Sequence, residues 1–175
     1  MKQILVAIFT IVILLTITGC DEESDPPRGF TNGITATIAG GNGQYSRELP
    51  ARTDVQCEIK TYPGITVVEM TAYTAKDEKW FIKFRWNPES DVSRIKISES
   101  TYNEITFTSE DIGNFRIASS DGALADETYI DIIELVEDDI IKATFRGFIY
   151  RQGVTAQADT LKNGYMITKT FVKPN

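Results

Sequence analysis

The chain has 175 residues, of which 42% are hydrophobic and 10% aromatic, with a formal net charge of −7, two cysteines and no histidine. Its size and composition are those of one folded globular domain, and its acidic balance argues against binding to nucleic acid. The lack of histidine excludes Ser-His-Asp and Cys-His catalytic sites and histidine-ligated zinc. Chemistry by carboxylates or Ser-Lys pairs and oxygen-ligated metals such as calcium stay open, but no motif indicates a catalytic site, a metal or a cofactor.

The first 19 residues have the parts of a secretory signal. Lys2 is followed by an uncharged apolar run from Ile4 to Ile17 and then by small residues. The run has 14 residues, fewer than the roughly 17 to 25 that a membrane-spanning helix needs. We therefore interpret residues 1–19 as a cleaved signal peptide and not as a permanent membrane anchor.

Ile17-Thr18-Gly19-Cys20 directly follows this run and resembles the lipobox of bacterial lipoproteins. The resemblance implies cleavage before Cys20 and acylation of its thiol; an ordinary signal peptide with a chance cysteine is the alternative. Two or three acyl chains would give a stable membrane anchor, because a single chain binds only marginally and each buried CH₂ adds about 0.8 kcal/mol. The mature chain would keep 17 basic and 25 acidic side chains, a formal charge of −8.

Residues 20–29 continue with four acidic residues in five positions and then two prolines. Such a segment cannot bury apolar surface, and it predicts a solvated, disordered tether between the lipid and the folded domain. Acidic residues directly after the lipobox cysteine resemble the export signal of Bacteroidota surface lipoproteins, which implies a lipid-anchored protein on the outer membrane, surface-exposed and not periplasmic. In other Gram-negative groups an Asp at this position implies retention at the inner membrane.

From residue 30 to residue 175, short runs with period-two alternation are separated by turn residues, and no window of ten or more residues shows a helical stripe. The fold class is therefore predicted to be all-β, a single antiparallel β-sandwich or partly open β-barrel. The expected strands are Ile34–Ala39, Val55–Lys60, Ile65–Thr74, Lys79–Trp86, Arg94–Ser98, Glu104–Thr108, Asn114–Ala118, Thr128–Glu137, Ile140–Tyr150 and Tyr165–Val172.

The alternation also predicts which side chains form the core. Trp80 and Trp86 share the apolar face of one strand, which favours a core position over a sugar-stacking one, while Lys83 and Arg85 share the opposite face. Phe145 belongs to the apolar set of the strand near the C-terminus. Cys57 lies in an alternating pattern and is expected to be a small buried apolar residue.

A tight turn at 138–139 would join two strands into a hairpin in which Asp131 lies opposite Arg146. The same register places Glu134 beside Ala143 on the apolar face. A carboxylate there either lies in water at the end of the sheet or is buried with a raised pKa, and the latter can mark a functional site.

The candidate ligand-binding residues are Tyr62, Tyr102 and Glu134. Tyr62 lies next to the turn Pro63-Gly64 and Tyr102 lies in a polar stretch, so both are expected to be exposed. Residues 143–148 and 163–168 resemble the closing hairpin and last strand of small β-rich lipoproteins of unknown function in Bacteroidota. That resemblance implies no catalytic residues.

Three functions are compatible with these features. The favoured hypothesis is a non-enzymatic lipoprotein of the cell envelope whose β-domain binds a glycan, a peptide or an envelope protein. The second is a carboxylate-dependent hydrolase, for example one that acts on glycans, with Glu134 or the Asp138-Asp139 turn as its site. The third is a structural component that self-assembles through an exposed sheet edge.

Overall fold

A computed structural model of the chain describes residues 32–40, 46–52, 54–73, 78–87, 89–90, 93–109, 114–136, 139–151, 154–169 and 171. Cys20, the predicted signal peptide and the predicted tether lie outside the described residues. Among the residues described, no helix has the length and apolar character needed to cross a membrane.

In the described ranges, eleven strands form one antiparallel sheet with the order β2-β1-β11-β10-β8-β7-β5-β4-β3, and β9 pairs with β10 and β6 beside this path. In chain order they are β1 (Gly33–Ala39), β2 (Ser46–Arg52), β3 (Asp54–Tyr62), β4 (Ile65–Tyr73), β5 (Lys79–Trp86), β6 (Arg94–Lys96), β7 (Glu104–Ser109), β8 (Asn114–Ser119), β9 (Tyr129–Val136), β10 (Ile140–Arg151) and β11 (Val154–Thr168). Two 3-10 turns, η2 (Ile97–Glu99) and η3 (Ala125–Glu127), complete the described elements.

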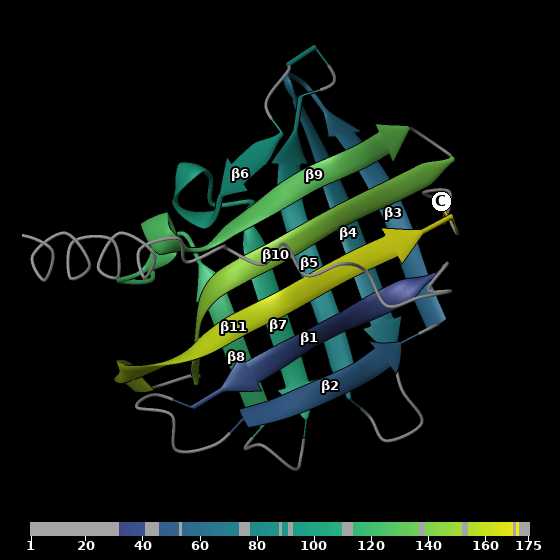
Figure 1. Ribbon diagram of the computed structural model, residues 1–175. Helices are drawn as coiled ribbons and strands as arrows, with labels where there is room; N and C mark the ends of the chain where they lie inside the picture. Colours follow the sequence, from purple (N-terminus) through teal and green to yellow (C-terminus); the bar gives the residue numbers. More distant parts are fainter. Residues whose placement is uncertain are drawn as a thin grey trace, which may run out of the picture.

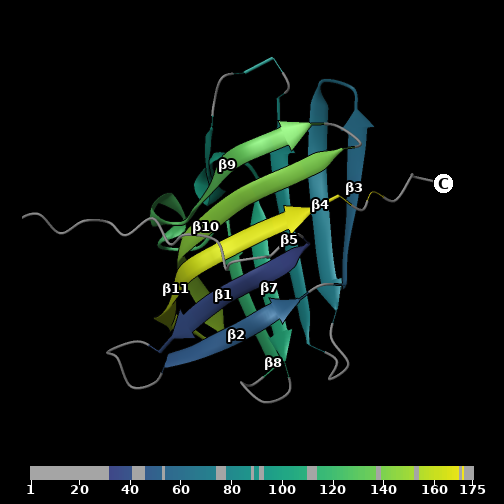
Figure 2. The same ribbon diagram turned by 45° about the vertical axis from the view of Figure 1, so that its right-hand side comes forward.

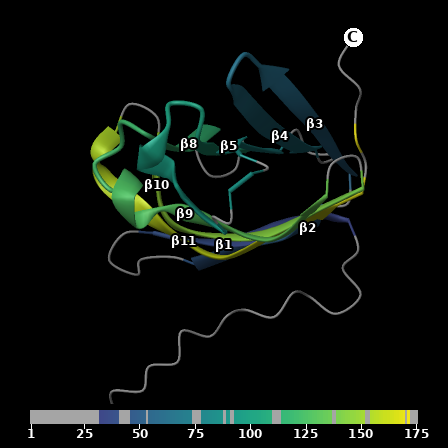
Figure 3. The same ribbon diagram turned by 90° about the horizontal axis from the view of Figure 1, so that it is seen from above.

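The sheet folds over into two layers. A front layer of β9, β10, β11, β1 and β2 crosses a back layer of β8, β7, β5, β4 and β3 (Figure 1), and a turned view shows the same two layers (Figure 2). Seen from above, the layers are joined on the side of β10 and β8 (Figure 3). On the other side Cys57 of β3 forms a parallel bridge with Phe171, so the sheet is nearly closed and barrel-like. This confirms the all-β prediction.

Large side chains fill the space between the layers. The indole of Trp80 lies 4.7 Å from the ring of Phe107 and 5.7 Å from that of Phe145, measured between ring centroids. All three are buried, as are Phe84 and Cys57. The predicted core positions of Trp80, Phe145 and Cys57 are thus confirmed, and Trp86 packs against the core while partly buried.

β10 takes part in both layers. Its first part pairs with β9, and its last residues, Tyr150 and Arg151, pair with β8. Between these parts Gly147 has a φ of +135°, a conformation that residues with a side chain rarely adopt. A Cβ at Gly147 would also lie 2.4 Å from the Cα of Thr128. Only glycine therefore fits at the point where β10 changes partner.

Thr128 forms hydrogen bonds with backbone groups at the point where β10 changes partner. Its Oγ1 accepts a hydrogen bond from the N–H of Phe148 at 2.9 Å and lies 3.1 Å from the carbonyl oxygen of Leu124. Its own carbonyl oxygen accepts a hydrogen bond from the N–H of Ile97 at 2.8 Å. A buried backbone N–H without a partner costs about 1–3 kcal/mol, so the Thr128 hydroxyl replaces a ladder bond that the sheet cannot supply there.

The structure differs from the predicted strands in two places. The alternation does not predict β2, because its sequence SRELPAR has no regular apolar face. It also places the start of the last strand at Tyr165, whereas β11 begins at Val154. Both missed segments are polar, and their positions depend on pairing with neighbours and not on an apolar face of their own.

The predicted register of the β9–β10 hairpin is wrong. Asp131 lies opposite Thr144, and Tyr129 takes the predicted place opposite Arg146. The register already differs at the turn, since Val136 lies opposite Ile140 where a two-residue turn would place Glu137, and the ladder shifts again between Lys142 and Ala143, where β9 has an additional residue. Such a β-bulge shifts every later pair along the strand by one residue, and the local alternation does not predict it.

Replacing Phe145 with Ala should reduce the free energy of unfolding by about 3–5 kcal/mol, because it leaves a cavity beside Trp80 and uncovers Gly164. The matched control is Ile133→Ala, since Ile133 is 53% exposed and its replacement should change stability by less than about 1 kcal/mol. Chemical denaturation of both variants measures the difference. Equal midpoints for the two variants would contradict the assignment of Phe145 to the core.

Candidate functional site

The outward side chains of β3, β4, β5 and β7 form a mixed polar and aromatic surface, which we call the outer face. They alternate with buried side chains along each strand, and they lie opposite one another across the ladders. The described members are Gln56, Glu58, Lys60, Tyr62, Ile65, Val67, Glu69, Thr71, Tyr73, Lys79, Phe81, Lys83, Arg85, Glu104, Thr106 and Thr108.

Lys60 holds two like charges together on the outer face. Glu58 and Glu69 lie directly opposite each other on β3 and β4, an arrangement that destabilises a sheet by itself. The Nζ of Lys60 lies 2.6 Å from an oxygen of Glu69 and 3.2 Å from an oxygen of Glu58. The hydrogen bond to Glu69 is the main cause of a raised pKa for Lys60, opposed by some desolvation and supported by Glu58.

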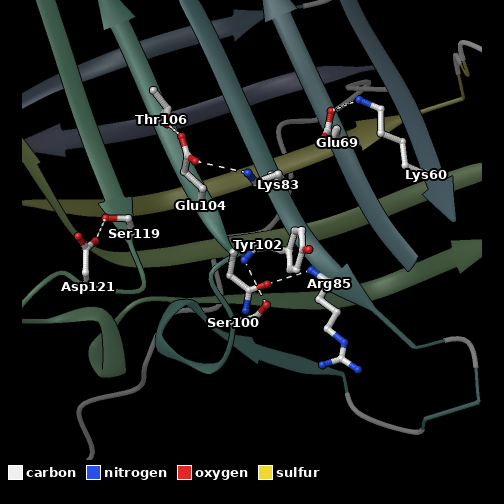
Figure 4. Close-up of polar contacts among 11 residues, drawn as sticks. Lys60, Glu69, Lys83, Arg85, Ser100, Tyr102, Glu104, Thr106, Ser119 and Asp121 are labelled. Carbon is white, nitrogen blue, oxygen red and sulfur yellow. Dashed lines mark hydrogen bonds and ion pairs between the residues drawn. The ribbon is translucent and has the colours of Figure 1, made fainter. Parts of the chain in front are cut away.

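Lys83, the next lysine along the outer face, is also paired with a carboxylate. Lys83 lies 3.7 Å from Glu104 on the neighbouring strand, and Glu104 accepts a hydrogen bond from the hydroxyl of Thr106 at 2.6 Å (Figure 4). Toward the far end of β5, Lys79 lies over the ring of Tyr73, 5.5 Å from its centroid. This cation–π contact occupies the end of the outer face opposite to Tyr62.

Tyr62 and Tyr102 lie at the same end of the outer face. Tyr62 ends β3 at the hairpin with β4, and it is 49% exposed. Tyr102 is 40% exposed and precedes β7. Lys83 lies opposite Glu104, so the same register continued by two residues brings Tyr102 beside Arg85, as Figure 4 shows. The prediction that both tyrosines are exposed is confirmed.

Asn103 fixes the turn that carries Tyr102. This residue is 2% exposed. Its Oδ1 accepts a hydrogen bond from the N–H of Arg85 at 2.9 Å, and its Nδ2 donates to the carbonyl oxygen of Lys96 at 2.8 Å. Its own N–H donates to the carbonyl oxygen of Ser100 at 2.9 Å. An amide side chain thus extends the β5–β7 ladder beyond its last backbone pair and holds Tyr102 in place.

Glu134 does not belong to this surface. It lies on β9 in the front layer, opposite Lys142, and it is exposed. The expectation that it lies beside Ala143 on the apolar face is wrong, because the bulge at Ile133 turns it outward. Its charge acts on Tyr165, whose pKa is raised mainly by burial and further by Glu134.

The residues suggested for a hydrolase are not brought together with one another in a buried site. Glu134 and Asp139 are both exposed, so neither has the dry surroundings that tune a carboxylate for acid–base catalysis; Asp138 lies outside the described residues. The described part of the chain holds no cluster of three or more acidic or cysteine side chains suited to a metal ion. Burial, with a smaller effect of Glu58, raises the pKa of the Cys57 thiol to about 12, which makes it a poor nucleophile.

Two of the edge strands, β2 and β9, have features that oppose pairing between copies; β3, at the other end of the strand order, is a further edge strand. β2 contains Pro50, which lacks an N–H donor, among charged residues. β9 pairs with β6 only over the three residues Tyr129, Ile130 and Asp131, and it carries the bulge at Ile133 further along. Bulges and charges at an edge strand discourage addition of another strand. Self-assembly through β2 or β9 is therefore disfavoured.

Comparison with known proteins adds no family. No protein-family model matches the chain, and neither the curated proteins nor the solved structures contain a match.

The sequence singles out Tyr62 and Tyr102, but it does not single out Lys60, Val67 and Arg85, which lie between them in space. The alternation places Arg85 on the polar face of its strand but does not predict which side chains of other strands lie beside it. Which cation has a carboxylate opposite it follows from the register of three ladders, and no signal along the chain contains that information.

Replacing Lys60 with Met should lower the free energy of unfolding at pH 8 by about 0.5–1 kcal/mol, because Glu58 and Glu69 then face each other without a cation between them. Lys60 has a raised pKa in the folded protein, so its stabilisation is complete below its usual pKa of about 10.4 and is lost as the pH rises through the raised value. Urea denaturation of wild type and variant at pH 8 and pH 11 measures this.

The difference in the free energy of unfolding between wild type and Lys60→Met should be smaller at pH 11 than at pH 8. Lys83→Met is the control, because Lys83 contacts one carboxylate at the longer distance of 3.7 Å and should give a smaller effect. A gap that is the same at both pH values would show that Lys60 acts through packing and not through its charge.

Proposed function

We propose that the protein is a lipoprotein of the bacterial cell envelope, anchored by lipid on Cys20, whose β-domain binds a glycan on the outer face between Tyr62 and Tyr102. It acts as a binding protein and not as an enzyme. Its lipid would hold it on the outer membrane, with the domain exposed at the cell surface. The observation that carries the binding proposal is that two exposed tyrosines, Tyr62 and Tyr102, lie at the same end of the outer face.

The filled interior supports binding on a face. In lipocalin-like barrels the interior holds the ligand, but here Trp80, Phe107 and Phe145 occupy the centre with essentially no exposed surface. The ligand would therefore contact outward side chains. A tyrosine offers a flat apolar ring with a polar hydroxyl and loses little conformational entropy on binding. These properties suit the alternating apolar and hydroxyl surfaces of a sugar.

The spacing of the tyrosines supports an extended ligand. β3, β4, β5 and the turn before β7 are neighbours, so Tyr62 and Tyr102 are separated by three strand spacings of about 4.8 Å and by two residues of about 3.3 Å along the strands, or about 16 Å in all. Between them Val67 is 1% exposed although it points outward, which means that neighbouring side chains cover it. A chain of several sugar units could lie across these side chains and contact both rings.

The N-terminal region supports the location. The 12 residues from Asp21 to Asn32 reach at most about 40 Å when fully extended. Such a reach keeps the domain near the membrane while letting it turn toward soluble ligands or ligands bound at the cell surface. The acidic charge of the segment opposes a second attachment to anionic lipid.

Metabolic labelling with an alkyne fatty acid in a bacterial host should mark the protein, and Cys20→Ser should abolish the label and move the protein from the membrane to the soluble fraction. Cys57→Ser is the matched control, because Cys57 is buried in the barrel and its replacement should leave the label unchanged. An unlabelled wild-type protein, or one whose N-terminus is still Met1, would refute lipid anchoring.

Binding of the intact protein in detergent to an array of envelope and host glycans should give at least one specific ligand. Tyr62→Ala and Tyr102→Ala should each weaken its binding about tenfold or more, equivalent to about 1.4 kcal/mol. Tyr73→Ala is the control, since Tyr73 is 48% exposed but ends β4 at the opposite end of the outer face. Equal losses in all three variants, or no glycan bound, would refute this binding site.

A further inference from the structure

Arg85 differs from the other cations around the proposed site, and it carries an inference that rests on the proposed function and deepens it. Arg85 is exposed on β5, and its guanidinium extends away from the strands in Figure 4. Lys60 is held by Glu58 and Glu69, and Lys83 by Glu104. Within the described part of the chain, the Arg85 side chain has no ion pair and no hydrogen bond.

The place of Arg85 is between the two tyrosines. Lys60 lies opposite Val67, and Val67 lies opposite Arg85; Tyr102 follows on the next strand. Tyr62 is two residues beyond Lys60 on the same face of β3. Arg85 is thus about one strand spacing from Tyr102, and about two strand spacings and two residues along the strands from Tyr62, with strands about 4.8 Å apart. A ligand that contacts both rings crosses β5 close to Arg85.

The backbone of Arg85 is fixed before any ligand arrives. Its N–H donates to the buried amide of Asn103, and its other neighbour in the sheet is Val67. Only the side chain has freedom to adjust. A cation on a rigid strand, flanked by two aromatic rings, is the kind of preorganised group that binding sites use.

An arginine at this point selects for an anion. The planar guanidinium can donate two parallel hydrogen bonds to a carboxylate, sulfate or phosphate group. Because the protein as a whole is acidic, with a formal charge of −7, long-range electrostatics do not attract anions in general. An anionic ligand would bind only where directed hydrogen bonds and ring stacking act together.

We infer that the ligand of the outer face is an acidic glycan, whose anionic group binds the Arg85 guanidinium while neighbouring sugar rings stack on Tyr62 and Tyr102. A neutral glycan would contact the rings and leave the guanidinium in water. The anionic group would be a uronic acid carboxylate or a sulfate ester, since both match the same pair of donors. Lys60 and Lys83 offset two of the three carboxylates beside them, Glu58, Glu69 and Glu104, so only one net negative charge opposes the ligand there.

The test compares saccharides that differ only in charge. Intact protein in detergent is titrated with oligogalacturonate and with its methyl ester, and with sulfated and desulfated carrageenan oligosaccharides, which contain no uronic acid. At least one acidic member should bind about tenfold or more tightly than its neutral partner, and raised salt should weaken its binding. The preference for the carboxylate pair or for the sulfate pair identifies the anionic group.

Arg85→Gln should abolish the preference for the acidic member and leave binding of the neutral member within about twofold of wild type. Arg85→Lys should keep the charge but recover only part of the preference, because an ammonium group lacks the paired donors. Lys79→Gln, at the other end of the same strand, should change nothing. Thermal unfolding of each variant checks that the fold is intact.

Three outcomes would overturn the inference, and the first two are distinguishable from failure of the proposed function. If neutral and acidic members bind equally and the Tyr62 and Tyr102 variants weaken both, the glycan site stands and its selection for anions is refuted. If Arg85→Gln keeps the full preference for an acidic member, the anion binds elsewhere and the role of Arg85 is refuted. If no saccharide of either kind binds, both proposals fail.

Discussion

The change of partner within β10 is the constraint on which the rest of the molecule depends. One strand pairs with β9 in the front layer and with β8 in the back layer, and it can do so only because Gly147 adopts a backbone conformation that other residues avoid. Thr128 supplies the hydrogen bond that the interrupted ladder lacks. The two layers are thereby brought face to face, and their inner side chains can meet in one core.

This closure decides where a ligand can bind. Once the layers meet, the rings of Trp80, Phe107 and Phe145 occupy the centre, and an interior as densely filled as this leaves the outward side chains to provide function. The outer face of the back layer is such a surface. There Lys60 and Lys83 are paired with carboxylates across strands and Lys79 lies over aromatic rings, whereas Arg85 lies between two exposed tyrosines without an ion pair among the described residues.

The electrostatic arrangement of the outer face has a second consequence. Lys60 allows Glu58 and Glu69 to lie opposite each other, so the acidic residues of this surface are used within the sheet and are not free to bind a cation. Among the described residues of the outer face, Arg85 thus offers a local point that favours an anion although the protein as a whole is acidic. Specificity of this kind depends on contacts at short range, since the long-range field of the molecule has the opposite sign.

The sequence by itself determined the period-two pattern, the all-β class and the inward positions of Trp80 and Phe145, because the pleat of a strand makes these properties local. It also indicated that Tyr62 and Tyr102 are exposed, from the turns beside them. Only the tertiary structure decided that these two share one end of a face and that a bulge at Ile133 turns Glu134 into water. Strand order, register and bulges depend on contacts between distant segments, and a shift of one residue reverses every side chain.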